Sequence, residues 1–217
     1  MSLTLYAHPF SSYCQKVLIA LWENDHIFAY RNLEEPEAGQ ERAELWPVGT
    51  FPVLLDGSET VAESSIIIEH LDLRRPGHLR MVPESGPAAL EVRFLDRFFD
   101  NYVMAAVQKP VFEAIRPDGG RREEAVAEAR EVLEISYAWL ENRLGQRAWA
   151  AGDNFTLADC AAAPALFYAD WVHEIAAAYP SVRGYRSRLL ARPSFARAVE
   201  EARPYRAYFP LGAPERD

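Results

Sequence analysis

Two adjacent serines precede the first helical segment of the chain, within residues 8–15 (HPFSSYCQ). Ser12 and Gln15 have the spacing of a capping box, which predicts that the Ser12 hydroxyl closes the helix N-terminus and that Ser11 is free. A hydroxyl between a first strand and a helix lies where unpaired N–H groups and partial positive charge can hold an anion, such as a thiolate. Ser11 is therefore a candidate for binding such an anion.

The cysteines offer little chemistry of their own. Cys14, Val17, Leu18 and Leu21 recur at i, i+3, i+4 and i+7, which predicts that Cys14 lies on the apolar face of the first helix. The chain has one other cysteine, Cys160, and two are too few for a disulfide framework or a cysteine-rich zinc site. We expect no metal and a reducing, cytoplasmic location.

The first third of the chain must position these groups. Short β-prone runs alternate with helical patterns there, and the order is strand, helix, strand, helix, strand, strand, helix. The predicted strands are residues 3–6, 28–33, 53–55 and 60–61, and the predicted helices are residues 12–23, 36–45 and 65–73. This order predicts an α/β domain over residues 1–76 with a small, mixed, four-stranded sheet.

The rest of the chain reads as helix. Residues 77–86 are rich in proline and glycine and predict a linker, so the second domain covers residues 87–217. Its predicted helices cover residues 88–115, 121–144, 157 onward, 181–191 and 194–202, and a breaker stands at residues 116–120 (RPDGG). We expect an all-α domain followed by an irregular aromatic tail.

Composition excludes several classes of function. The 217 residues carry 23 Lys and Arg against 32 Asp and Glu, and this net charge of −9 disfavours binding to phosphate backbones. No apolar run approaches the roughly 18 residues of a membrane span. The N-terminus also lacks the pattern of a secretory signal. We expect no nucleic-acid or membrane partner.

Four segments, in chain order, resemble those of serine-type glutathione transferases, and a theta- or zeta-like bacterial member in particular. They are residues 8–17 (HPFSSYCQKV), 47–54 (PVGTFPVL), 61–68 (VAESSIII) and 152–159 (GDNFTLAD). Together with the two predicted domains they cover most of the chain. The resemblance implies a thioredoxin-like N-terminal domain, an all-helical C-terminal domain and a homodimer.

The resemblance also implies roles for individual residues. Ser11 would donate a hydrogen bond to the glutathione sulfur, and the backbone of Phe51, before a cis Pro52, would hold the cysteinyl part of glutathione. Glu63 and Ser64 would bind its γ-glutamyl amine and carboxylate. Tyrosine-type members use a tyrosine at the position of Ala7, so strand alternation points Tyr6 to the opposite face of the sheet.

Two further sets of residues come from the helical half. Thr156 and Asp159 have the spacing of a variant capping box, with Phe155 and Cys160 as its hydrophobic staple.

Ligand sites favour domain interfaces, which suggests an electrophile site where the helical domain and the tail meet the first domain. Its candidate residues are Tyr102, Tyr168, Trp171 and Phe209.

The predicted activity is conjugation of the glutathione thiolate to a small hydrophobic electrophile, as in detoxification. Glutathione would be a co-substrate, and no cofactor is expected. A glutathione-dependent isomerase of the maleylacetoacetate type is one alternative, and turnover of that substrate would reveal it. A catalytically silent, protein-binding scaffold is another, and failure to bind glutathione would favour it. A thiol-disulfide oxidoreductase is disfavoured, because Ser11 replaces the attacking cysteine.

Overall fold

The computed structural model describes residues 2–118 and 122–217. In its first part the elements are β1 (Leu3–Ala7), α1 (Ser12–Glu23), β2 (Phe28–Asn32), α2 (Pro36–Leu45), β3 (Val53–Asp56), β4 (Glu59–Ala62) and α3 (Ser64–Arg74). The strands form one sheet in the order β2-β1-β3-β4. β1 is parallel to β2 and antiparallel to β3, and β3 is antiparallel to β4. This confirms the predicted thioredoxin-like α/β arrangement.

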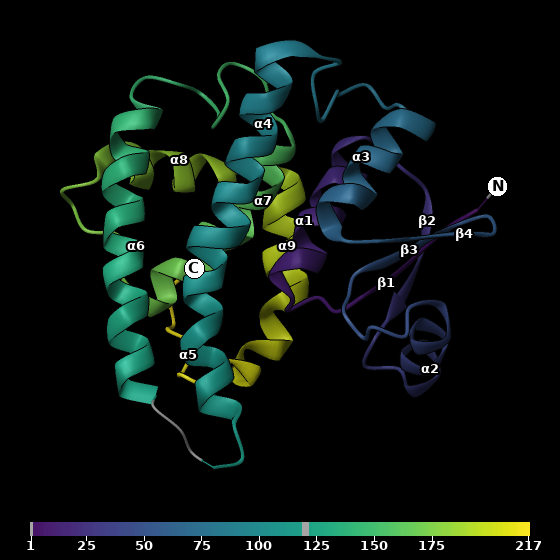
Figure 1. Ribbon diagram of the computed structural model, residues 1–217, viewed down its shortest axis with the longest axis horizontal. Coiled ribbons are helices and arrows are strands. Elements are labelled where there is room, and N and C mark those ends of the chain that lie inside the picture. The colour runs from purple at the N-terminus through teal and green to yellow at the C-terminus, as the bar shows by residue number, and fades with distance from the viewer. Residues whose placement is uncertain (1, 119–121) are drawn as a thin grey trace.

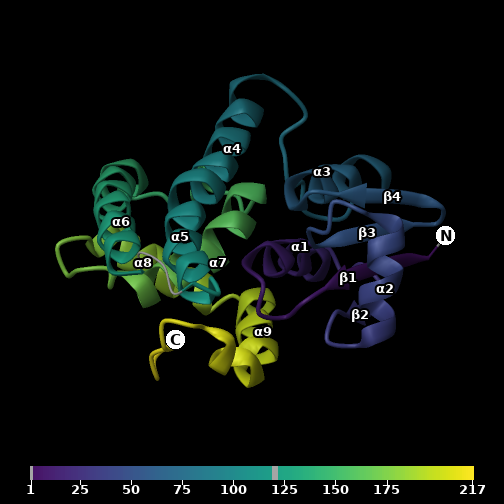
Figure 2. The same ribbon diagram turned by 60° about the horizontal axis from the view of Figure 1, so that its bottom comes forward.

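β1 places alternate side chains on opposite faces of the sheet. Leu5 and Ala7 belong to the main core with side chains of α1 and α3, whereas Tyr6 belongs to a small apolar cluster with side chains of α2. Figure 2 shows α2 on the other side of the sheet from α1 and α3. The Tyr6 hydroxyl donates a hydrogen bond to Glu41 on α2 at 3.0 Å. The predicted orientation of Tyr6 is therefore confirmed, and its hydroxyl faces away from Ser11.

The second part of the chain is helical, as predicted. Its elements are α4 (Gly86–Phe98), a π-helical segment (Phe99–Met104), α5 (Ala105–Ile115), α6 (Arg122–Leu144), α7 (Leu157–Val172), α8 (Pro180–Leu190), α9 (Pro193–Ala202) and a 3₁₀ helix (Arg203–Tyr208). The helix predicted for residues 88–115 is thus interrupted by π-helical turns, which widen the helix and rotate the residues after it. Gly119 and Gly120 of the predicted breaker, and Arg121 at the predicted start of the next helix, lie outside the described residues.

α1 connects the two parts of the molecule. It packs against α3 on the sheet side and against α7 and α9 on the helical side (Figure 1). The predicted apolar face of α1 is buried throughout, with Cys14, Val17 and Leu21 inaccessible to solvent. Near its end, Glu23 accepts a hydrogen bond from Arg192 Nε, at the start of α9, at 2.7 Å. Before its other end, Phe10 C=O accepts a hydrogen bond from the Tyr168 hydroxyl on α7 at 2.9 Å, so the N-terminus of α1, where Ser11 stands, also lies close to the helical part.

The segment between α3 and α4, residues 75–85, overlaps the predicted linker 77–86. Hydrogen bonds hold this segment to α3 and to the start of α7. The buried Asp72 carboxylate accepts from Met81 N–H at 3.0 Å and from Val82 N–H at 3.1 Å. Met81 C=O accepts from Leu157 N–H, at the start of α7, at 2.9 Å. The division into domains 1–76 and 87–217 stays a prediction.

The N-terminus of α7 contains the predicted capping interaction. Asp159 accepts hydrogen bonds from Thr156 N–H at 2.8 Å, from Ala150 N–H at 2.8 Å and from the Tyr185 hydroxyl at 2.6 Å. Burial raises the pKa of Asp159, and these bonds oppose that effect. Phe155 and Cys160, the predicted staple, are both buried. Asp159 thus joins the start of α7 to α8 and to the loop that precedes α7.

Replacing Asp159 by asparagine should therefore destabilise the fold. The amide presents a donor group where the carboxylate accepts from N–H groups, so at least one buried donor loses its partner. We expect the free energy of unfolding to fall by about 2–3 kcal/mol. Urea denaturation followed by circular dichroism measures this. Asp153→Asn, at an exposed position of the same loop, is the control, and equal stability of the two variants would contradict the prediction.

Candidate active site

Ser11, not Ser12, is the N-cap of α1. Its backbone is extended (φ −82°, ψ 124°), and its Oγ accepts a hydrogen bond from Cys14 N–H at 3.4 Å. Ser12 is the first helical residue and is buried. The turn after β1, closed by a bond from Ser11 N–H to His8 C=O at 3.0 Å, ends at Ser11 and starts the helix there. The prediction that Ser12 is the cap is therefore wrong.

The partner predicted for Ser12 is engaged elsewhere. The Gln15 side-chain amide donates to Pro9 C=O at 2.9 Å and to the Tyr168 hydroxyl at 3.1 Å. Gln15 thus fixes the turn before α1 to α7, and it takes no part in a capping box.

The Ser11 hydroxyl can still donate a hydrogen bond while it caps α1. A serine oxygen that accepts one hydrogen bond still has its own O–H to donate. Ser11 lines a cavity between the two parts of the molecule, and the unpaired N–H groups at the start of α1 favour negative charge there. One side chain can therefore both cap α1 and donate to an anion.

Cys14 is not the reactive group of this region. Its side chain is inaccessible to solvent, and its Sγ accepts a hydrogen bond from His8 N–H at 3.3 Å. Burial raises the pKa of the Cys14 thiol to about 12. The thiol is therefore protonated at neutral pH and is a poor nucleophile.

Four of the predicted glutathione-binding residues meet in one cavity of about 260 Å³, which we call the inner compartment. Phe51 and Pro52 reach it from the loop before β3, and Glu63 and Ser64 from the corner between β4 and α3. The Phe51–Pro52 peptide bond is cis, as the family resemblance implies. The structure thus brings these residues together from two segments.

The corner between β4 and α3 has an unusual backbone. Glu63 is the N-cap of α3 and has φ +71°, a left-handed conformation that non-glycine residues rarely adopt. Such strain persists where the surroundings enforce it, and it is frequent at ligand sites. The exposed Glu63 carboxylate and the first N–H groups of α3, at the buried Ser64, therefore offer one anionic and one anion-binding group side by side.

A second cavity of about 480 Å³, the outer compartment, adjoins the inner one. Ser11 lines it together with Tyr168 and Phe209, two of the predicted electrophile-site residues. Apolar side chains from the π-helical segment, α5 and the C-terminal tail complete most of its wall, among them Met104, Val107, Val111, Phe112 and Pro210. None of the described residues that line it is charged, so it suits an apolar, neutral molecule.

The other two predicted electrophile-site residues lie elsewhere. Trp171 stands behind the wall, with its ring centroid 5.3 Å from that of Tyr168 and 5.2 Å from that of Phe209. Tyr102 is 56% exposed and contacts Phe98 instead, because the π-helical turns point Phe99 and Val103 inward and Tyr102 outward. Tyr102 therefore does not line the outer compartment.

Three residues line both compartments, namely Tyr13, Thr50 and Phe51. Tyr13 was not anticipated from the sequence, although it stands only two residues after Ser11. Its hydroxyl donates a long hydrogen bond of 3.4 Å to Gln108 Oε1 on α5. Burial and the nearby charge of Asp100 raise the pKa of Tyr13 to about 12. The two compartments thus meet at these three residues.

Comparison with known proteins agrees with this geometry. Residues 5–78 match the family described as "Glutathione S-transferase, N-terminal domain", and residues 102–193 match "Glutathione S-transferase, C-terminal domain". The chain belongs to the glutathione S-transferase family. The inner compartment is formed mainly by the first of these family domains, whereas both family domains and the C-terminal tail line the outer compartment.

Proteins similar in sequence to this glutathione S-transferase family member are named for different functions. A "Stringent starvation protein A homolog" of Coxiella burnetii is 28% identical and covers 92% of each chain. A "Probable maleylacetoacetate isomerase" of Vibrio cholerae is also 28% identical, over 94% of this chain and 98% of its own. A solved glutathione S-transferase of Methylobacterium radiotolerans, in complex with glutathione sulfonate, is 31% identical over 92% and 95%, with a TM-score of 0.76.

Beneath the inner compartment, this family member contains a buried ionic cluster that the sequence analysis did not anticipate. Lys16, only 1% exposed, contacts Asp96 at 2.5 Å and Asp100 at 2.7 Å through its Nζ, and donates to Ser65 Oγ at 2.9 Å. Arg97 donates to the same two carboxylates from the rim, at 2.7 and 3.1 Å. The cluster joins α1, α3 and α4. A lysine on a helix gives no sequence signal of such burial.

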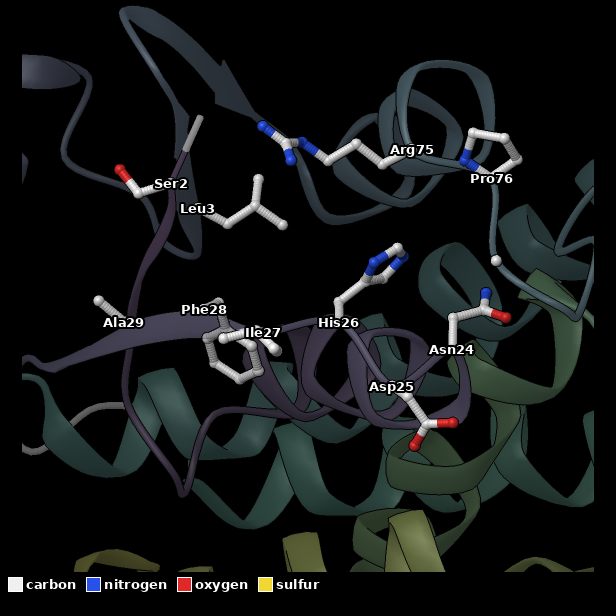
Figure 3. A pocket seen from close by; sticks show the side chains of 11 residues that line it. Ser2, Leu3, Asn24, Asp25, His26, Ile27, Phe28, Ala29, Arg75 and Pro76 are labelled. Atoms are coloured by element: carbon white, nitrogen blue, oxygen red, sulfur yellow. The ribbon is translucent and has the colours of Figure 1, made fainter.

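Another cavity, of about 590 Å³, lies at the opposite end of the sheet. Figure 3 shows its lining at the start of β1, the turn after α1 and the end of α3, including Leu3, His26 and Arg75. The Arg75 guanidinium donates to Asp56 Oδ2 at 2.9 Å. Since Ser11 follows the other end of β1, this cavity is remote from the candidate site.

Within residues 2–118 and 122–217, no three or more His, Cys, Asp or Glu side chains are grouped so as to hold a metal ion. In the same ranges no helix combines the length and apolar character needed to cross a membrane.

Proposed function

We propose that this protein is a serine-type glutathione transferase that conjugates glutathione to a small hydrophobic electrophile. The observation that carries the proposal is the pair of adjoining compartments. The inner one contains the residues expected to bind the peptide, and the outer one is apolar and uncharged, with Ser11 in its wall. A solved relative holds glutathione sulfonate, which supports a glutathione-sized ligand in this fold. Detoxification and a cytoplasmic location are part of the proposal.

The inner compartment has groups that match glutathione. The Glu63 carboxylate complements the γ-glutamyl ammonium, and the Ser64 hydroxyl with the N-terminus of α3 complements its carboxylate. The backbone of Phe51 is available to the cysteinyl part. With the peptide held in this way, its sulfur would lie toward Ser11 and the outer compartment.

Ser11 then acts on the sulfur. A free thiol titrates near 8.5, so only about 3% is thiolate at pH 7, and each unit by which the pKa falls is worth about 1.4 kcal/mol. The Ser11 O–H and the N-terminus of α1 stabilise the thiolate, and the thiol proton passes to solvent. The thiolate then forms a carbon–sulfur bond with the electrophile. Ser11 is a hydrogen-bond donor and never a covalent nucleophile.

Calorimetric titration with glutathione tests the proposal, followed by a panel of neutral electrophiles. Binding followed by conjugation supports it. Failure to bind glutathione would reject it in favour of a catalytically silent scaffold. Maleylacetoacetate isomerisation is less favoured, because that substrate carries two carboxylates and no cationic side chain lines the described wall of the outer compartment. Turnover of maleylacetoacetate would reverse this preference.

Glu63→Gln should weaken glutathione binding with little change in kcat, because Glu63 holds a part of the peptide that does not react. The amide keeps the shape of the side chain but loses its charge. We expect KM for glutathione to rise about tenfold or more, as loss of a charge-assisted hydrogen bond implies. Steady-state kinetics measure this, with Glu59→Gln on the exposed start of β4 as the control. An unaltered KM would remove Glu63 from the site.

We further propose that the protein is a homodimer. Large apolar side chains stand exposed on one face formed by α4 and α6, including Phe94 at 49% and Ile135 at 70% exposure. Phe94 packs against Trp139 of α6, so the two helices contribute to one surface. Light scattering at micromolar concentration should give about twice 24.6 kDa, and Phe94→Asp should shift the protein toward the monomer. A parent protein that remains monomeric would contradict this prediction.

A further inference from the structure

Tyr13 stands at the boundary where glutathione and the electrophile would meet. Of the three side chains that line both compartments, Phe51 has no polar group, and the Thr50 hydroxyl is engaged by Trp46 Nε1 at 2.9 Å. Tyr13 belongs to the first turn of α1, next to Ser11, and its phenol reaches across to Gln108 on α5. Its hydroxyl is thus a donor close to the place where bonds would change.

The Tyr13 hydroxyl is protonated, and its hydrogen bond to Gln108 is weak. Because burial and Asp100 raise its pKa to about 12, the phenol retains its proton at neutral pH. Its bond to Gln108 Oε1 is 3.4 Å long, beyond the 2.5–3.0 Å usual for O–H···O bonds. A better acceptor in the outer compartment would therefore displace Gln108 at little cost.

A hydroxyl donor at this place would serve one class of substrate in particular. When a thiolate adds to an α,β-unsaturated ketone, negative charge develops on the ketone oxygen. The described residues around this compartment include no cation to neutralise that charge. An uncompensated charge in an apolar space is costly, and a preorganised O–H donor lowers this cost.

Resting on the proposed function, we infer that Tyr13 is a catalytic residue that binds the carbonyl oxygen of α,β-unsaturated carbonyl substrates. In the step, sulfur bonds to the β-carbon, and the carbon–carbon π pair shifts so that the carbonyl oxygen becomes an enolate oxygen. The Tyr13 O–H donates to that oxygen and keeps its proton. Water then protonates the α-carbon and the carbonyl re-forms. The products are the thioether and hydroxide, which takes up the proton released by the glutathione thiol.

Tyr13→Phe removes only the hydroxyl and separates this role from packing. Two neutral substrates of similar size are compared, trans-4-phenyl-3-buten-2-one, which forms an enolate, and benzyl chloride, which releases chloride and forms none. For the enone we expect kcat/KM to fall about 100-fold or more, because removal of one oxyanion donor typically costs about 100- to 1000-fold. The rate with benzyl chloride and the Kd for glutathione should stay within about twofold of the parent values. The pKa of the bound thiol should stay within about 0.3 unit of the parent value.

Tyr179→Phe is the matched control, since its hydroxyl donates to Glu134 on α6, away from both compartments. An equal loss with both substrates would make Tyr13 a packing residue and overturn the inference, as would an unchanged rate with the enone. A parent protein that conjugates benzyl chloride but not the enone also overturns it, while the proposed function stands. If the parent binds no glutathione, the proposed function fails and this inference fails with it.

Discussion

Ser11→Ala is expected to lower conjugation at neutral pH by about 10- to 100-fold, because it removes the hydroxyl that we propose donates to the glutathione sulfur. The pKa of bound glutathione should move upward, toward the free value of about 8.5. Since Ser11 also caps α1, the same variant should lose about 0.5–2 kcal/mol of stability. Ultraviolet absorbance of the thiolate against pH, together with a urea denaturation curve, measures both effects.

Ser12→Ala is the matched control for this experiment. Ser12 is the first residue of α1, and no hydrogen bond of its side chain closes the helix. We therefore expect the bound thiol of this variant to titrate as in the parent. If Ser12→Ala raises the pKa of the bound thiol and Ser11→Ala does not, the catalytic donor is Ser12. If neither variant changes it, the N-terminus of α1 stabilises the thiolate without a serine.

Lys16→Met should cause the largest loss of stability. Lys16 contacts both Asp96 and Asp100 in the buried cluster, and without it two carboxylates face each other out of reach of most solvent. Removing one partner of a buried ion pair typically costs about 3–5 kcal/mol. Urea denaturation gives this difference as a change in the midpoint. Arg97→Met, at the half-exposed rim, is the control and should lose much less.

The loss caused by Lys16→Met should also depend on pH. Burial raises the pKa of Asp100, and Lys16 opposes that effect, so the variant should raise this pKa further. A group whose pKa is raised by folding contributes stability below its unfolded pKa and loses it as pH rises through the folded value. The deficit of the variant should therefore be smaller near pH 4 than near pH 7. A deficit below about 1 kcal/mol at pH 7 would contradict the role given to Lys16.

The start of α1 shows why local spacing was not enough to place the helix cap. Ser11 and Ser12 are both good N-cap residues, and the Ser12–Gln15 spacing favoured the second. The structure starts the helix one residue earlier, because the turn after β1 closes on Ser11 and because Gln15 bonds to Tyr168 on α7. A contact between distant segments therefore decided between two locally equivalent caps.

Contacts between distant segments also decide which side chains line the two compartments. Tyr102 and Tyr13 are both tyrosines on helices near the domain interface, and their sequences do not show which one faces the cavity. π-Helical turns at residues 99–104 rotate Tyr102 toward solvent, whereas the packing of α1 leaves Tyr13 between the two compartments. Rotation of a helix about its axis is set by its packing against neighbours.

The sequence by itself determined the order of strands and helices, the apolar face of α1, the orientation of Tyr6 and the capping interaction of Asp159. These features follow from periodicity and from pairs of residues a few positions apart, which are local physical signals. Only the tertiary structure decided that Ser11 caps α1, that Lys16 is buried between two aspartates, and that Tyr13 joins the two compartments. Each of these depends on segments far apart in the chain, whose contacts no local pattern encodes.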